Sequence, residues 1–399
     1  MPVTFQKKYI DVIKVGSDTY SLSVNVYRVS KLMDDEDIKK QEGHNFDEKY
    51  YLKILKKENA DVYSDTGKLL LKIRKKVIPK NLTLRAIDSF VAASKKKHEN
   101  RGAASGILDR NKLRGYVGKL LDPSDFRSGY KSSVSGIDSK QKISNLSPSN
   151  IAGFFDKPDR NLKGKGAPCR MTAFNRDNVE KWENAIPYIK RVDRLFKHLV
   201  PEAHKKQLER AQSTPKYAIA DTSFSTITIN YSWRTGMHTD SGDYKDGYGN
   251  LVVCEDPNNP NTYTGCYLGF PQYGVAVDVR DGDFLAMDVH EWHCNTEFKP
   301  TSKKKYLTES KNKDNKKDVL NNWHYNRLSM VHYLRDGMLK CKSLKNRINS
   351  GTSTALTSRK SLEQRGGLKT LSTSQNLRKL QEQLPQEYVT LMQKYGLFL

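Results

Sequence analysis

The sequence predicts an α+β fold: a core of double-stranded β-helix type, jelly-roll or cupin-like, with flanking helices and an N-terminal α/β region. Short β runs separated by Gly, Pro and Asn turns between residues 223 and 335 favour a compact antiparallel barrel or jelly roll. An apolar stripe at helical spacing within residues 175–211 predicts a long flanking helix.

The N-terminal region predicts a mixture of strands and a helix. Residues 9–29 alternate between apolar and polar side chains around a turn at Gly16-Ser17-Asp18, which predicts a hairpin. A second strand pair brackets Thr66-Gly67, and apolar residues at helical spacing predict a helix over residues 82–97.

Residues 94–166 are rich in Lys, Arg, Ser and Gly, with Phe126 and Tyr130 among the basic side chains. Basic residues interleaved with aromatic ones contact phosphates and stack on bases in nucleic-acid-binding proteins. The same composition also fits a solvated loop region with anchoring aromatics. Both interpretations stay open for this stretch.

The helical pattern of residues 175–211 carries an internal Pro187, which we expect to kink or divide the helix. Beyond residue 340, a Ser/Thr/Lys-rich composition predicts a flexible basic linker and then a short C-terminal helix. The expected organisation is an N-terminal α/β region with basic loops, a β domain of double-stranded β-helix type, the linker and the helix, at residues 1–166, 167–340, 341–375 and 376–399.

The chain is strongly basic. Its 69 Lys and Arg residues exceed its 45 Asp and Glu residues, which gives a formal net charge of +24. Such a charge attracts polyanions, of which nucleic acid is the commonest. Some viral, organellar and ribosome-associated proteins are equally basic without acting on DNA, so the charge does not choose a substrate.

The cysteine pattern and the hydropathy argue against disulfide-bonded, zinc-ribbon, secreted and membrane-spanning proteins. The five cysteines are odd in number and form no C-x-x-C pair, which argues against a disulfide framework and against a zinc ribbon. The first residues lack the apolar stretch of a signal peptide, and no segment approaches about 18 uninterrupted apolar residues. We therefore expect a soluble intracellular protein of the cytoplasm, nucleus or a virus, not secreted and without a membrane partner.

Two histidines and an aspartate have the spacing of a metal site. A predicted strand, TITINYS, leads into His238 and Asp240, whose side chains point the same way from an extended chain. A later run begins at Gly282-Asp283 and reaches His293. Two imidazoles and one carboxylate leave three positions free on an octahedral ion, as in non-haem Fe(II) oxygenases. His290 competes for the third position, but the spacing from the Gly-Asp turn favours His293 and leaves His290 a supporting role.

A second group of residues suits a carboxylate. Arg327 and Ser329 alternate on one strand face, and a guanidinium beside a hydroxyl can hold a carboxylate, which suggests a dicarboxylate cosubstrate. Asn230 is assigned to the same cofactor-binding set. An internal salt bridge is the alternative role for Arg327.

This order of strand, HxD pair, Gly-Asp turn, distal His and R-x-S strand resembles the Fe(II)/2-oxoglutarate dioxygenases. Within them the chain is similar to the branch of the TET proteins and the J-binding-protein thymine hydroxylases. The similar segments are PCRMTAF, FSTITINYSWRTGMHTDSGD, LGFPQYG, GDFLAMDVHEWHCN and RLSMVHYLR. The resemblance covers residues 168–336 well, the N-terminal part loosely and the tail not at all. Two departures are the Lys-rich insert 302–318 and Cys266, where a glycine is expected.

The resemblance implies a set of cofactors and roles. Fe(II) would be held by the catalytic residues His238, Asp240 and His293, and 2-oxoglutarate by Arg327, Ser329 and Asn230, with dioxygen as the oxidant. The implied reaction is hydroxylation of the 5-methyl group of thymine or 5-methylcytosine in double-stranded DNA.

The resemblance also implies how the substrate would be held. The target nucleotide would be flipped out of the duplex to reach the iron. In relatives, residues at the positions of Asp243 and Arg335 face the base; here they either do the same or pair only with each other. Basic residues would hold the duplex through its phosphates, particularly the 94–131 stretch and Lys303, Lys304, Lys305, Lys316 and Lys317. The alternative for the Lys-rich insert is an exposed loop without such a contact.

Two other functions remain open at this point. A protein prolyl or lysyl hydroxylase shares the same iron geometry but needs neither the charge of +24 nor a pocket for a flat base. A basic DNA-packaging or virion protein could keep the fold without turnover, although such a protein has no physical need for all five residues of the ligand set and the clamp.

Overall fold

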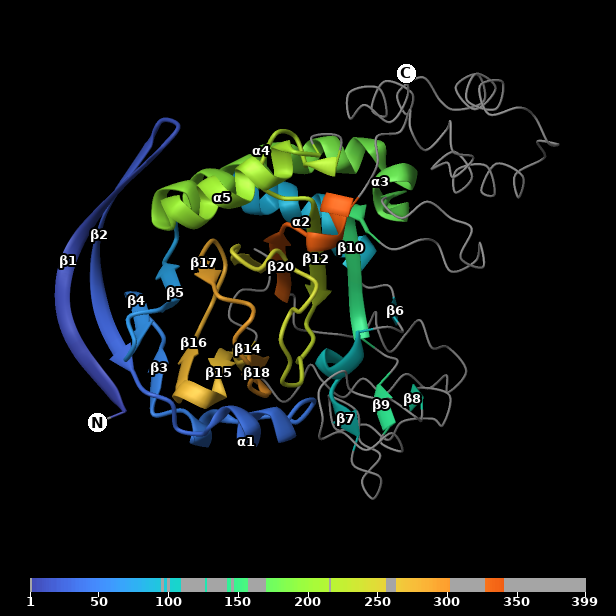
Figure 1. The fold of residues 1–399 in the computed structure, drawn as a ribbon. Helices are drawn as coiled ribbons and strands as arrows, with labels where there is room; N and C mark the ends of the chain where they lie inside the picture. The colour runs from blue at the N-terminus through green and yellow to red at the C-terminus, as the bar shows by residue number, and fades with distance from the viewer. Residues whose placement is uncertain are drawn as a thin grey trace, which may run out of the picture.

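The computed structural model describes residues 2–94, 97–98, 101–108, 126–127, 142–144, 147–156, 170–214, 217–255, 263–301 and 327–340. These residues form an α+β fold, as the sequence predicts, with helices laid over one face of a large sheet (Figure 1). A smaller sheet packs against the other face, because side chains from both sheets share one buried apolar cluster.

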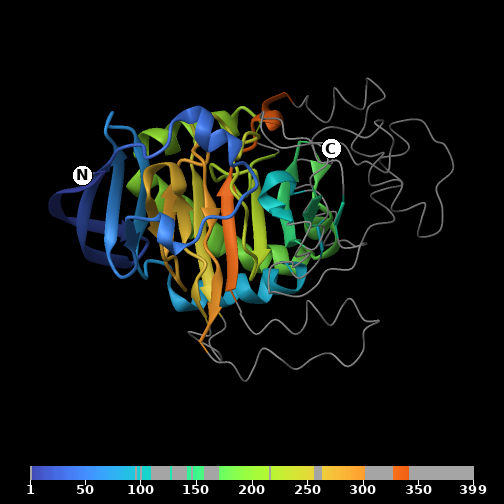
Figure 2. The same cartoon turned by 90° about the horizontal axis from the view of Figure 1, so that it is seen from below.

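The large sheet runs in the order β1-β2-β4-β5-β17-β13-β20-β12-β10-β11, with β6 paired to β10. The blue N-terminal strands continue the row of yellow and orange strands in Figure 2. The strands are β1 (Val3–Val15), β2 (Asp18–Val29), β4 (Asn59–Ser64), β5 (Leu69–Arg74), β6 (Lys97–His98), β10 (Ser147–Phe155), β11 (Arg170–Met171), β12 (Thr226–Tyr231), β13 (Gly249–Glu255), β17 (Phe284–Met287) and β20 (Arg327–Tyr333).

The predicted N-terminal elements are confirmed. The hairpin of β1 and β2 turns at Gly16, which has a φ of +63°. The second pair, β4 and β5, encloses Thr66-Gly67, and the helix that follows is α2 (Lys80–Ser94). Because β5 pairs with β17, this region is an extension of the large sheet.

The smaller sheet has the order β18-β15-β16-β3, in which only β3 comes from the N-terminal region. Further short pairings join β14 to β19, and β9 to β7 and β8. The bounds are β3 (Lys53–Leu55), β7 (Ile107–Leu108), β8 (Phe126–Arg127), β9 (Lys142–Ser144), β14 (Tyr263–Gly265), β15 (Leu268–Phe270), β16 (Val275–Val277), β18 (Cys294–Asn295) and β19 (Phe298–Pro300).

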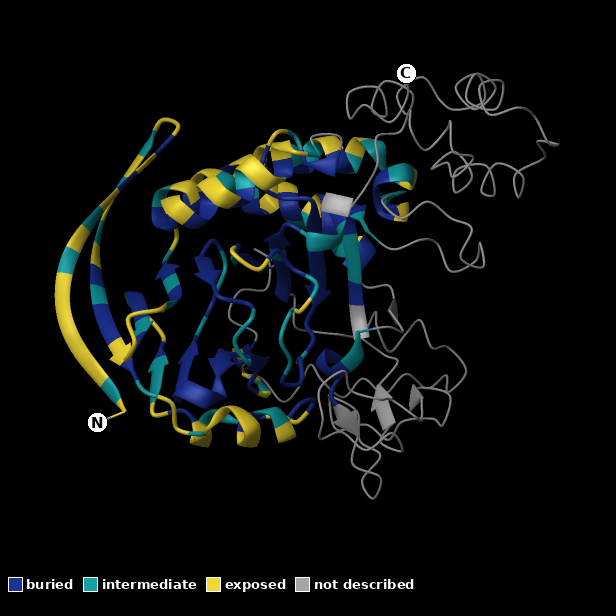
Figure 3. Cartoon of the chain, viewed as in Figure 1, coloured by how far each residue is buried: buried dark blue, intermediate teal, exposed yellow. Residues whose placement is uncertain are grey.

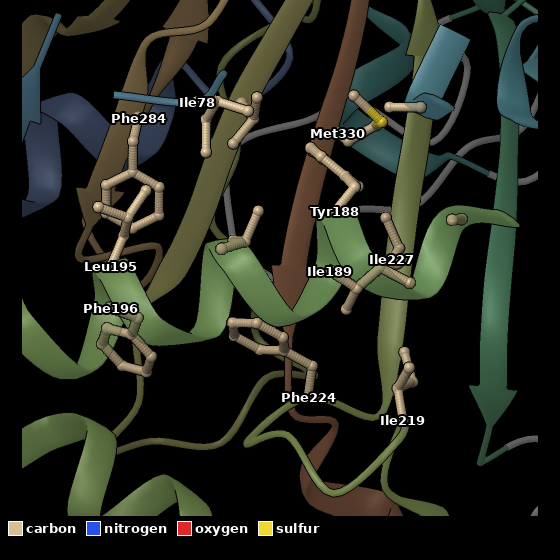
Figure 4. Close-up of a cluster of buried hydrophobic side chains, with 14 of the residues drawn as sticks. Ile78, Tyr188, Ile189, Leu195, Phe196, Ile219, Phe224, Ile227, Phe284 and Met330 are labelled. Atoms are coloured by element: carbon tan, nitrogen blue, oxygen red, sulfur yellow. The ribbon is translucent and has the colours of Figure 1, made fainter. Parts of the chain in front are cut away.

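Three helices follow β11: α3 (Ala173–Asp177), α4 (Val179–Leu199) and α5 (Pro201–Gln212). The apolar face of α4 lies across the large sheet, where its side chains meet Ile227, Phe284 and Met330 (Figure 4). The opposite faces of α4 and α5 are exposed (Figure 3). This packing is what the apolar stripe of residues 175–211 predicts.

Pro187 does not divide the helix, contrary to the sequence-based expectation; α4 continues through it. Pro187 is exposed, so the backbone carbonyl that loses its hydrogen bond can be satisfied by water. The division falls at Val200, which leaves helical geometry at φ −135° and ψ 63° just before Pro201 opens α5.

Alternation along the central strands separates an apolar face from a polar one. On β12, Ile227 and Ile229 pack against the helices, whereas Thr228 and Asn230 line a cavity between the sheets. On β20, Leu328 and Met330 face the helices while Arg327 and Ser329 line the same cavity. The large sheet thus directs a row of polar side chains into the space between the sheets.

Some predictions concern residues outside the described ranges. The insert 302–318, Tyr130, the linker 341–375 and the C-terminal helix 376–399 all lie there. Within the described ranges, no helix is both long and apolar enough to cross a membrane.

The buried His332 of β20 predicts a pH-dependent stability. Its ring lies 5.4 Å from that of Tyr188, and its Nδ1 is 2.9 Å from the Asn250 carbonyl oxygen. Burial lowers the pKa of His332 from 6.5 to about 4. Between pH 4 and pH 6.5, His332 is therefore protonated to a larger extent in the unfolded chain than in the folded protein. Stability should therefore fall as the pH drops from 6.5 towards 4, by up to about 3 kcal/mol from this residue.

Urea unfolding of the metal-free protein across this pH range measures the effect. His332→Gln, which does not titrate there, should give a shallower loss of stability with falling pH. Equal slopes for the two proteins would show that His332 takes no part.

Candidate active site

Two loops meet back to back and bring the predicted metal ligands together. One follows β12 and carries His238 and Asp240; the other follows β17 and carries His293. The backbones of His238 and His293 exchange two hydrogen bonds of 3.0 Å, and the Asp240 amide donates to the Val289 carbonyl at 2.9 Å. The contact therefore holds all three side chains at one point.

The donor atoms of His238, Asp240 and His293 lie within 4.8 Å of one another. Each histidine Nε2 is 3.8 Å from a different oxygen of Asp240. Two donors bound at about 2.1 Å to one ion lie no more than about 4.2 Å apart, so the two separations of 3.8 Å are compatible with a shared metal. Two imidazoles and a carboxylate are the donor set of non-haem Fe(II) oxygenases.

Backbone carbonyls orient both imidazoles. His238 Nδ1 lies 2.8 Å from the Gly236 carbonyl oxygen, and His293 Nδ1 lies 2.9 Å from that of Glu291. A protonated Nδ1 that donates to a carbonyl leaves the Nε2 lone pair free for a metal. The site thus selects the tautomer that metal binding requires.

The protonation states of His238 and Asp240 also suit metal binding. Burial, with a smaller contribution from His293, lowers the pKa of His238 to about 4, so this imidazole is neutral at pH 7. Burial opposes ionisation of Asp240, but the two neighbouring imidazoles hold the pKa of its carboxyl below the ordinary value. A neutral imidazole and an ionised carboxylate are the forms that bind metal.

His290, the competing candidate, is not part of the group of donors. Its amide donates to Asp288, and its Nε2 lies 3.2 Å from the Tyr244 carbonyl oxygen. The ring therefore links the loop of His293 to the loop of Asp240. Lys68 of the N-terminal region supports the same loop through ion pairs of 2.7 Å to Asp288 and 2.6 Å to Glu291.

The donor group opens into a cavity of about 400 Å³ that also contains Arg327, Ser329 and Asn230. Asn230 and Ser329 are opposite each other in the ladder of β12 and β20. Among the described residues, the Arg327 guanidinium has no ion pair, and its buried Nε and the Asn230 Oδ1 have no hydrogen-bond partner.

The nearby Glu255 does not neutralise Arg327, because it is held by Arg280 at 2.6 and 2.8 Å. The internal salt bridge considered for Arg327 is therefore absent from the described residues. A buried guanidinium without an anion is unfavourable, so the cavity suits an added carboxylate. The residues present fit both a ferrous ion and 2-oxoglutarate.

Asp243 and Arg335 also line the cavity, but no hydrogen bond or ion pair joins their side chains within the described residues. Arg335 Nε instead pairs with Asp156 at 2.6 Å, and Asp243 Oδ2 is buried without a partner. Burial and the charge of Asp240 raise the pKa of the Asp243 carboxyl. A Cβ on Gly242 would lie 2.7 Å from Arg335 Nη2, so this glycine lets the guanidinium approach the loop.

The sequence analysis missed two charged residues of this cavity, Glu42 and Arg101, both from the N-terminal region. The Arg101 guanidinium lies 5.6 Å from the centre of the Trp233 ring. Its positive charge acts to lower the pKa of the Asp240 and Asp243 carboxyls. Burial raises the pKa of Glu42 to about 7. The basic character of residues 94–166 is a sequence signal for Arg101, although it does not say which residues reach the site, and no pattern in the sequence marks Glu42.

Comparisons with known proteins agree with this geometry. Residues 150–336 match the model of the oxygenase domain of the 2OGFeDO superfamily in its TET/JBP form. Thymine dioxygenase JBP1-B of Trypanosoma cruzi is 31% identical over 202 residues, and thymine dioxygenase JBP1 of Trypanosoma brucei brucei is 32% identical over 187. The aligned parts are 49% and 47% of this chain but only 22% and 19% of those proteins.

A solved structure, NgTET1 in complex with 5mC DNA, aligns with 75% of this chain and 90% of its own, at 13% identity and a TM-score of 0.43. The cofactors of the matched superfamily are Fe(II) and 2-oxoglutarate, for which the cavity has suitable residues. Residues 150–336, just under half of the chain, are thus similar to the oxygenase domain of the TET/JBP family of 2-oxoglutarate- and iron-dependent oxygenases.

Proposed function

We propose that the chain is a dioxygenase that hydroxylates the 5-methyl group of a pyrimidine in double-stranded DNA. The observation that carries the proposal is one cavity holding three side chains that could bind a metal beside Arg327, which has no ion pair among the described residues. Thymine is favoured over 5-methylcytosine, because the aligned relatives from trypanosomes are named thymine dioxygenases. We also propose that the two facing sheets form a double-stranded β-helix.

His238, Asp240 and His293 would hold Fe(II), while Arg327, Ser329 and Asn230 would hold 2-oxoglutarate. Once bound, the two cofactors supply the activation of dioxygen: 2-oxoglutarate is oxidised to succinate and carbon dioxide, and one oxygen atom enters a methyl C–H bond of the substrate. Arg327 orients the cosubstrate by charge and hydrogen bonding, and Ser329 adds a hydroxyl donor. Leu251, Leu268, Met287 and Val331 line the cavity and limit its water content.

A methyl group inside a duplex cannot reach this recessed site, so the proposal includes flipping of the nucleotide into the cavity. Asp243 and Arg335 carry polar atoms that could pair with the base edge. The net charge of +24 favours binding of the flanking duplex through its phosphates. The lysines of the insert 302–318 are proposed phosphate contacts.

The test is incubation of the protein with Fe(II), 2-oxoglutarate, dioxygen and duplexes containing thymine or 5-methylcytosine, followed by mass spectrometry of the nucleosides. A hydroxymethylated base supports the proposal. Succinate formed only with proline- or lysine-containing peptides would instead identify a protein hydroxylase. Absence of turnover with every substrate would favour a non-catalytic DNA-packaging role.

Removal of the metal-binding carboxylate should separate catalysis from DNA binding. Asp240→Ala is expected to lower the affinity for Fe(II) at least about 100-fold, because even groups that merely orient a ligand affect affinity 10- to 100-fold. Equilibrium dialysis and the turnover assay measure this loss, and duplex affinity should stay near its original value. Asp246→Ala, exposed in the same loop, is the matched control. Equal loss of iron binding in the control, or of DNA binding in Asp240→Ala, would show a structural role.

Loss of the Arg327 guanidinium should raise the 2-oxoglutarate concentration that the enzyme needs. Arg327→Ala removes a buried charged partner of a carboxylate, an interaction of about 2–5 kcal/mol, so the KM for 2-oxoglutarate should rise at least about 30-fold. Ser329→Ala removes one hydroxyl and should raise it only about 2- to 10-fold. Steady-state kinetics measure both values, and an unchanged KM in Arg327→Ala would remove this residue from the proposed cofactor site.

A further inference from the structure

Glu42 is a buried carboxyl group that the proposed chemistry does not yet use. It follows α1 (Asp35–Lys40), is 6% exposed and lines the same cavity as the metal-binding residues. Its Oε2 is buried and has no hydrogen-bond partner. Three other buried acids of the described chain are paired: Asp61 with Arg74, Glu255 with Arg280, and Asp283 with Lys75. Asp243 Oδ2, in the same cavity, shares the lack of a hydrogen-bond partner.

The backbone around Glu42 is fixed to the metal-binding loop. The Gly43 amide donates to the Met237 carbonyl at 2.7 Å, and the Met237 amide donates to that of His44 at 2.8 Å. A Cβ on Gly236 would lie 2.7 Å from the Gly43 oxygen, so the two segments are in close contact. The position of Glu42 is thereby tied to the residue that precedes His238.

The surroundings exclude two roles for this carboxyl. Glu42 is not a member of the donor group formed by His238, Asp240 and His293. A second anion would repel 2-oxoglutarate, whose fitting partner is Arg327. A buried acceptor without a partner loses its hydration on folding and regains a hydrogen bond only from a ligand or water in the cavity.

We propose that Glu42 is a substrate-recognition residue that accepts a hydrogen bond from an N–H group on the edge of the flipped pyrimidine. Thymine offers its N3–H, and 5-methylcytosine offers its N4 amine. This inference rests on the function proposed above and adds to it a residue supplied by the N-terminal region. Asp243 and Arg335 come from other elements, so Glu42 gives the base a contact independent of theirs.

The experiment measures how binding depends on the base. The full chain is held without oxygen, with Fe(II) and 2-oxoglutarate, and titrated into labelled duplexes that carry thymine, 5-methylcytosine or an abasic site at one central position. Fluorescence anisotropy gives each Kd. The variants are Glu42→Ala, which removes the acceptor, and Glu42→Gln, which keeps an oxygen acceptor but loses the charge. Glu36→Gln, exposed on α1, is the matched control.

At pH 8, above the pKa of about 7 of the Glu42 carboxyl, Glu42→Ala should weaken binding of the duplex with the recognised base about 10- to 100-fold, as expected for a hydrogen bond to a charged group. Glu42→Gln should weaken it less, and the abasic duplex should bind all three variants and the unaltered protein equally. Equal weakening on the base-containing and abasic duplexes would overturn the proposal, because a merely structural role affects both. Unchanged binding of every duplex by Glu42→Ala would overturn it as well.

Turnover by the unaltered protein separates this inference from the proposed function. If that protein hydroxylates a pyrimidine while Glu42→Ala keeps its kcat, KM and preference among bases, only the role of Glu42 is wrong. If the unaltered protein oxidises neither base, both are wrong.

Discussion

The candidate site depends on the backbone pairing between His238 and His293. Two hydrogen bonds of 3.0 Å join loops that leave different strands of the large sheet, and the bond from Asp240 to Val289 extends the contact. Side chains alone could not keep three donors within 4.8 Å, since without an ion between them these donor atoms form no hydrogen bond with one another. Main-chain bonds fix the positions, and carbonyls on each loop then fix the ring orientations. The donor group is therefore preorganised before any ligand arrives.

One face of the large sheet packs against the helices, and its other face carries buried polar groups without hydrogen-bond partners. Arg327 on β20 and Asn230 on β12 both have buried polar atoms without partners in the described chain, and each such atom costs folding free energy. The apolar cluster beneath α4 lies on the opposite face of the same strands. Successive residues of β12 and β20 point to opposite sides of the sheet. The strands that carry the unpaired polar atoms therefore also bury apolar side chains, and this apolar burial offsets the unfavourable free energy of the polar atoms. Unpaired groups at one site, supported by a well-packed layer, are typical of a binding cavity.

The sequence allowed the local elements and the site residues to be predicted, but not the long-range pairings. The hairpin of β1 and β2 and the grouping of His238, Asp240 and His293 follow from alternation and spacing. β13 has no such pattern, because GNLVVCE is buried along its whole length and shows no alternation. β10 was missed because its Ser-, Pro- and Gly-containing run forms a strand only through its ladder with β12. Glu42 and Arg101 reach the cavity through such tertiary contacts, which no local pattern records.

These contacts make the N-terminal region part of the site. β5 continues the large sheet beside β17, Lys68 pairs with Asp288 and Glu291 of the loop that bears His293, and the Ala104 carbonyl accepts from the Gly236 amide. The matched oxygenase domain begins at residue 150, so these contacts come from outside it. The candidate metal ligands lie within the matched part, and Glu42 and Arg101 of the preceding segment line the same cavity. The residues proposed to select the substrate can then vary without any change in those proposed to hold the cofactors, because the two sets come from different parts of the chain.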